Sequence, residues 1–128
     1  MACMIASEVI ETEGQRQAKL GQRLFGGLRQ AGLAVYQNGH PEKKLPNTWN
    51  ISFEGFDAVT VMESLSGVAV SPGAACHGDL CEPSRVLAAM GADPALARGA
   101  IRFSLGRETK EAEIDEVVEK LKKGLGRQ

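Results

Sequence analysis

The stretch 48-TWNISFEG-55 alternates apolar and polar side chains, which is the pattern of a β-strand with one buried face. The side chains predicted to face the core are Trp49, Ile51 and Phe53. Asn50 and Ser52 are predicted to face the opposite side of the same strand. A strand of this kind needs pairing partners and a layer over its apolar face, and the flanking sequence supplies both.

Three further segments have the pattern of short strands. In 33-LAVYQNG-39 an apolar run leads into an Asn-Gly turn. The segment 68-VAVS-71 predicts a strand that leads into a loop with two cysteines. The segment 100-AIRFSLGR-107 alternates again and places Arg102 on the polar face of its strand.

Long helices are predicted near both ends of the chain. Apolar residues recur at helical spacing from Ile5 to Ala31, and Gly32 is a natural C-terminal end. Several glycines weaken this first helix, so we expect it to pack against another element. Thr109 is predicted to cap the last helix, whose early turns are acidic, as the helix dipole prefers. The apolar stripe of the last helix consists of Ile114, Val117, Val118 and Leu121.

Shorter helices are predicted between the strands. Asp57 is the expected N-cap of one, which Gly67 ends. Its expected inner face consists of Val59, Met62 and Leu65. Another has Pro83 in its first turn and Gly91 as its stop. Its expected inner face consists of Val86, Leu87 and Met90. Asp93-Pro94 opens one more helical turn.

This order of elements predicts an α+β fold with a small, mainly antiparallel sheet and helices packed on one face. The chain has 128 residues, which is near the usual size of one domain, and the sequence has no internal repeat or long linker. We therefore expect residues 1–128 to form a single domain.

Composition excludes several classes of function. The net charge of -1 gives no basic field for nucleic acid or anionic lipid, and 5% aromatic residues argue against a base-stacking surface. No apolar run approaches the roughly 20 residues of a membrane span, and acidic residues follow the N-terminus too soon for a signal peptide. The cysteine count of 3 is odd, so a cytoplasmic protein with reduced thiols is expected.

The loop 71-SPGAACHGDLCEPSRVLAAMG-91 carries Cys76 and Cys81. Small residues before Cys76 leave a thin, accessible loop, which suits a reactive thiolate, although many unpaired cysteines are merely structural. Cys81 is the alternative candidate for the reactive thiolate, because the positive end of the following helix would lower its thiol pKa. A Cys76–Cys81 disulfide would be a reversible, regulatory bond rather than one that stabilises the fold.

Metal binding fits this loop poorly. Cys76, His77 and Cys81 do not have the spacing of common zinc sites, and Cys3 would have to supply a fourth ligand from a distant terminus. We therefore expect no metal site. Arg102 is the other candidate for chemistry, since a guanidinium held on a strand suits bidentate capture of a carboxylate. Taken alone, Arg102 is better explained as a solvated surface arginine.

Three stretches together resemble the C-terminal small domain of the NifS/IscS-like cysteine desulfurases, which belong to the class V aminotransferase family. They are LPNTWNISFEG, then GVAVSPGAACHGD with PSRVLAAMG, then ARGAIRFSLGRETKEAEIDEVVEKL. The loop sequence GAACHGD is also similar to that of selenocysteine lyases of the same family. The resemblance is ordered and covers the chain from about Gln15 onward.

The resemblance assigns roles to two residues. Cys76 falls on the loop nucleophile of the family, and Arg102 falls on the arginine that binds the substrate carboxylate. Cys81 matches no catalytic position, and DLCEPSR departs from the usual loop. In the family, pyridoxal phosphate holds L-cysteine, the loop thiolate takes the sulfur as a persulfide, and alanine is left. The persulfide then passes to a sulfur-acceptor protein.

The family's cofactor lysine lies in an S-x-H-K-type motif of its large domain, and this chain has no His-Lys pair. We therefore expect the chain alone to bind no pyridoxal phosphate and to be inactive without a partner that carries the large domain. The alternatives are a selenocysteine lyase small domain, a non-enzymatic persulfide carrier and an inert truncation. Expected partners are the large-domain protein, the acceptor, L-cysteine or selenocysteine and a second copy of the chain, but neither nucleic acid nor membrane.

Overall fold

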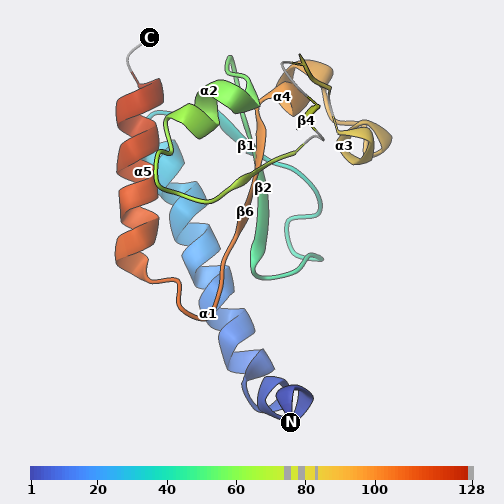
Figure 1. The fold of residues 1–128 in the computed structure, drawn as a ribbon, viewed down its shortest axis with the longest axis vertical. Coiled ribbons are helices and arrows are strands. Elements are labelled where there is room, and N and C mark those ends of the chain that lie inside the picture. The colour runs from blue at the N-terminus through green and yellow to red at the C-terminus, as the bar shows by residue number, and fades with distance from the viewer. Residues whose placement is uncertain (74–75, 78–79, 83, 127–128) are drawn as a thin grey trace.

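The computed structural model describes residues 1–73, 76–77, 80–82 and 84–126, and for residues 76, 77, 80 and 81 it describes the backbone only. The described chain contains both helices and strands (Figure 1). In order they are α1 (Ala2–Gln30), β1 (Val35–Gln37), β2 (Thr48–Phe53), α2 (Ala58–Glu63), β3 (Ser71–Pro72), β4 (Cys76–His77), β5 (Leu80–Cys81), α3 (Arg85–Ala89), α4 (Pro94–Arg98), β6 (Ala100–Ser104) and α5 (Glu111–Leu125).

The central sheet has four strands in the order β1-β2-β6-β3, and all three pairings are antiparallel. Strands β2 and β6 form its middle, with Trp49 opposite Phe103 and Ile51 opposite Ile101. A separate two-stranded sheet joins β4 and β5. The α+β class with an antiparallel sheet, expected from the sequence, is confirmed.

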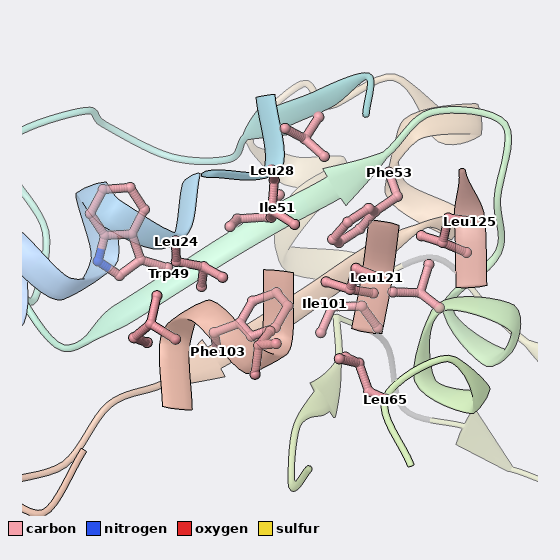
Figure 2. Packing of buried hydrophobic residues seen from close by; sticks show 14 of the residues in the cluster. Leu24, Leu28, Trp49, Ile51, Phe53, Leu65, Ile101, Phe103, Leu121 and Leu125 are labelled. Carbon is pink, nitrogen blue, oxygen red and sulfur yellow. The ribbon is translucent and has the colours of Figure 1, made fainter. Parts of the chain in front are cut away.

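One face of the sheet, here called the inner face, carries the core. Helices α1 and α5 lie side by side along this face (Figure 1), and apolar side chains from both meet those of β2 and β6 (Figure 2). The rings of Phe53 and Phe103 pack in a tilted arrangement, with centroids 6.5 Å apart and an interplanar angle of 53°. The predicted inward positions Trp49, Ile51 and Phe53 are all buried, so the alternation in β2 is confirmed.

Glycine in α1 allows the close packing of this layer. A β-carbon on Gly21 would overlap the indole of Trp49, and one on Gly27 would lie 3.0 Å from Val118 Cγ2. The expectation that α1 packs against other elements is therefore confirmed from Leu20 onward. Arg23 adds a bidentate pair across the two helices, with Nε 2.7 Å and Nη2 2.8 Å from the Asp115 carboxylate.

The inner faces predicted for the short helices are partly wrong. In α2, Val59 is 51% exposed, and Val61 is buried in its place. In α3, Val86 is 67% exposed and only Leu87 is buried, and Met90, at the C-cap, is 53% exposed. A helix of five or six residues has hardly more than one turn, so its few contacts, rather than its periodicity, decide which side is covered. Leu87 packs with Ala97 and Ala100 in a small second cluster.

Two predicted boundaries also shift. The strand expected at 68–71 is confined to Ser71–Pro72, because only these residues pair with β6. The N-cap of α5 is Lys110 rather than Thr109. The Thr109 hydroxyl instead accepts the Gly106 N–H, and the Glu113 carboxylate accepts the Lys110 N–H. The caps Asp57 and Asp93 are confirmed.

Among the described helices, none combines the length and the apolar character that a membrane crossing requires.

Candidate functional site on the outer face of the sheet

Arg102 lies in β6, on the face of the sheet opposite α1 and α5, here called the outer face. The register places it directly between Asn50 of β2 and Ser71 of β3. Its side chain is exposed, and its Nη2 donates to Ser71 Oγ over 3.4 Å. No ion pair joins Arg102 to a carboxylate among the residues that the structure describes. The guanidinium is thus available for an external anion.

A hydrogen-bonded network continues the polar surface beside Arg102. Asn38 Nδ2 donates to Asn50 Oδ1 and to Ser52 Oγ, both over 2.8 Å. Ser52 is fully buried, so this bond satisfies a hydroxyl that water does not reach. The alternation of β2 predicted that Asn50 and Ser52 lie on this face, but nothing in the sequence indicated that Asn38, in the Asn-Gly turn after β1, reaches them.

The segment that leads to Cys76 begins beside Arg102. Ser71 and Pro72 pair with Arg102 and Ile101, and the Gly73 N–H donates to the Ala100 carbonyl oxygen over 2.8 Å. The segment is thus bound to β6 until three residues before Cys76. Five residues of chain span at most about 17 Å, so the reach of the Cys76 backbone from Ser71 is bounded.

Cys76 and Cys81 lie in β4 and β5, where the register pairs them directly. Their side chains, with that of His77, fall outside the described residues, so thiol exposure and the zinc hypothesis stay untested. Cys3 is exposed in the first turn of α1. Within the described part of the chain, no three histidine, cysteine or acidic side chains gather as metal ligands. His40 accepts two backbone N–H groups through Nδ1.

The described residues do not fit a covalent pyridoxal phosphate site. Such a site needs a lysine amine facing the substrate. Burial lowers the pKa of Lys44, which would suit such an amine. However, its Nζ lies 3.0 Å from the centre of the Trp49 ring, which belongs to the inner face. None of the residues that the register places on the outer face is a lysine. We therefore derive no step through a cofactor bound covalently to this chain.

The sequence matches the family model described as Aminotransferase class-V over residues 4–117. A cysteine desulfurase IscS of Aeromonas hydrophila is 41% identical over 126 residues, and one of Salmonella typhi is 42% identical over the same length. Each alignment covers 98% of this chain but 31% of the relative. The chain thus spans less than a third of the length of these relatives.

Solved structures agree with the sequence matches. A structure titled NifS-like protein superposes with a TM-score of 0.81 at 31% identity, covering 97% of this chain and 31% of that one. A NifS-like protein from Rickettsia africae superposes with a TM-score of 0.76 at 22% identity, which is evidence for the fold alone.

Proposed function

Because the chain belongs to the class-V aminotransferase family, we propose that it is the small domain of a pyridoxal-phosphate-dependent cysteine desulfurase. In this proposal residues 1–128 are one domain, and the cofactor is held by the part of the relatives that this chain does not span. We place its action in the cytoplasm, where thiols stay reduced.

The position of Ser71 opposite Arg102 is the observation that carries the proposal. It joins the start of the segment that leads to Cys76 to β6, which presents the Arg102 guanidinium on the outer face. A carboxylate bound by Arg102 would therefore lie next to the segment that supplies the thiol. This is the arrangement that an amino-acid substrate requires when its carboxylate is bound and its side chain reacts.

In the proposed mechanism Arg102 binds the L-cysteine carboxylate and orients the substrate. The Cys76 thiolate attacks the substrate sulfur, so that a new S–S bond forms while the C–S bond of the substrate breaks. The carbon skeleton takes up a proton and leaves as alanine. Pyridoxal phosphate, bound by the part of the relatives that this chain does not span, would supply the electron sink for this cleavage. A sulfur-acceptor protein then takes the outer sulfur from Cys76.

The test is reconstitution. This chain is mixed with the complementary part of the Aeromonas hydrophila relative, pyridoxal phosphate and L-cysteine, and both alanine and sulfide are measured in the presence of a thiol reductant. We expect turnover in the mixture and none from either part. Cys76→Ser should abolish turnover, whereas Cys3→Ser should leave it unchanged, because Cys3 lies in the first turn of α1.

Peptide mass spectrometry locates the sulfur independently of turnover. We expect persulfide on Cys76 when the reaction with L-cysteine is quenched early, and alkylation by iodoacetamide at Cys76 before Cys81. Full turnover by the Cys76→Ser variant, or initial sulfur transfer to Cys81 with Cys76 unmodified, would reverse the assignment of the nucleophile.

A further inference from the structure

Cys76 and Cys81 are direct register partners in the two-stranded sheet of β4 and β5. Only two residues, Gly78 and Asp79, separate His77 from Leu80 in the sequence. A Gly-Asp pair between two strands is typical of a tight two-residue hairpin, whose length fixes the register. The turn sequence and the backbone pairing therefore agree in placing the two cysteines opposite each other.

This juxtaposition meets the distance condition for a disulfide. Directly opposed residues of an antiparallel pair have Cα atoms about 4.5–5.5 Å apart. Disulfides join residues whose Cα atoms are roughly 4.4–6.8 Å apart. The backbone register of the two cysteines is therefore compatible with the Cα separation that a disulfide requires.

The third cysteine is remote from this pair. Figure 1 places the N-terminal end of α1, which contains Cys3, at the opposite end of the longest axis from β4. Sulfur chemistry within one molecule is therefore confined to Cys76 and Cys81.

We propose that Cys81 is the resolving thiol of Cys76: it converts a persulfide on Cys76 into a Cys76–Cys81 disulfide and releases the outer sulfur as sulfide. The proposal rests on the proposed function, because it requires Cys76 to receive sulfur. The chain could then release the persulfide sulfur as free sulfide when no acceptor protein takes it.

The step balances without an external oxidant. The Cys81 thiolate attacks Cys76 Sγ, the bond between Cys76 Sγ and the outer sulfur breaks, and the new S–S bond forms. The outer sulfur leaves with the bonding electron pair as hydrosulfide. It is reduced as the Cys81 sulfur is oxidised, and the Cys81 proton goes to solvent. A small-molecule thiol such as glutathione then returns the disulfide to two thiols by exchange.

The persulfide arm of the test uses the full chain carrying Cys3→Ser. The chain is loaded with glutathione persulfide, desalted quickly, and followed by sulfide assay and intact mass. We expect release of one equivalent of sulfide and a product that lacks two hydrogens relative to the dithiol. With Cys81→Ser in addition, the extra sulfur should stay on Cys76. Equal persulfide lifetimes with and without Cys81 would overturn the proposal.

A second arm involves no persulfide. The chain is equilibrated in buffers of reduced and oxidised glutathione, and the internal disulfide is counted by mass after thiol alkylation. Leu80→Cys combined with Cys81→Ser is the register control, since it moves the thiol one residue along β5 and onto the other face. We expect the disulfide in the chain with Cys81 and much less in the control. Absence of the disulfide at every glutathione ratio overturns the proposal.

The two arms separate this inference from the proposed function. If reconstituted enzyme builds persulfide on Cys76 but Cys81 does not shorten its lifetime, the resolving role fails and the desulfurase assignment stands. If the glutathione-loaded chain releases sulfide through Cys81 but L-cysteine never delivers sulfur to Cys76, the desulfurase assignment fails and the resolving pair stands.

Discussion

Gly73 donates its backbone N–H to the Ala100 carbonyl oxygen over 2.8 Å, and a β-carbon on Gly73 would lie 2.9 Å from Ala100 Cβ and 3.2 Å from that oxygen. The contact holds the segment before Cys76 against β6, two residues from Arg102. Because backbone and a short side chain form the contact, little in it can move aside. The closeness of this approach therefore depends on glycine.

Gly73→Ala is expected to destabilise the chain by about 1–3 kcal/mol, because overpacking forces the backbone apart. Gly26→Ala is the matched control, since its added methyl would meet nothing within 4 Å. Because Gly26 lies within α1, Gly26→Ala should stabilise the chain by up to about 1 kcal/mol. Urea unfolding followed by circular dichroism measures both. A stabilised Gly73→Ala variant would contradict the close approach.

Arg102→Ala is expected to change the free energy of unfolding by less than about 0.5 kcal/mol, because the side chain is exposed. In the reconstituted enzyme it should abolish desulfurase turnover, since the substrate carboxylate loses its partner. Arg29→Ala, an exposed arginine in α1, is the control and should leave turnover unchanged. An unchanged kcat/KM for Arg102→Ala would show that this residue does not bind the substrate.

Asn38→Ala is expected to cost more stability than Ser52→Ala. Removing Asn38 leaves the buried Ser52 hydroxyl without its hydrogen-bond partner, a loss of roughly 1–3 kcal/mol. Removing the hydroxyl leaves Asn38 bonded to Asn50, so about 1 kcal/mol or less should be lost. Urea unfolding of the two single variants and the double variant gives the coupling free energy between the two side chains. Equal losses of stability in the two single variants, with no coupling free energy, would argue against the hydrogen-bonded network around Asn38.

Acid should weaken the contact between α1 and α5. The hydrogen bond from Arg23, with its positive charge, lowers the pKa of the Asp115 carboxyl. Its folded pKa is therefore below its unfolded value of about 3.9, so its stabilising effect is complete above that pH and disappears as pH falls through the folded pKa. Asp115→Asn should destabilise the chain at pH 7, and its difference from the unmodified chain should disappear as the pH falls through the folded pKa of Asp115.

Glu119→Gln is the control for that pH profile, because its carboxylate lies 3.8 Å from Lys122 within one exposed helix face. Thermal unfolding across pH compares the two variants. A difference between Asp115→Asn and the unmodified chain that persists undiminished in acid would show that something other than the carboxylate charge stabilises the pair.

The chain alone is expected to form no covalent bond with pyridoxal phosphate, because no described lysine faces Arg102 on the outer face. Incubation with the cofactor, borohydride reduction and peptide mass spectrometry test this. Labelling should be no greater than for the same chain unfolded in urea, in which every lysine is exposed. A single lysine labelled stoichiometrically in the folded chain, and lost on unfolding, would contradict the expectation.

Local pattern alone determined the main elements of this protein. The alternation at residues 48–53 placed Trp49, Ile51 and Phe53 in the core, because successive side chains of a strand point to opposite faces. The long helix α1 was predictable because apolar residues recur over many turns and Gly32, with a positive φ, follows its end. Arg102 was placed on the polar face of its strand by the same alternation.

Only the tertiary structure decided which residues meet. The bond from Asn38 to Ser52, the position of Ser71 opposite Arg102 and the contact of Gly73 with Ala100 all join separate segments. Strand order and register set these pairs, and neither is visible in a local window of sequence. The same holds for Val59 and Val86, which are exposed although their spacing is helical, because burial depends on what packs against a short helix.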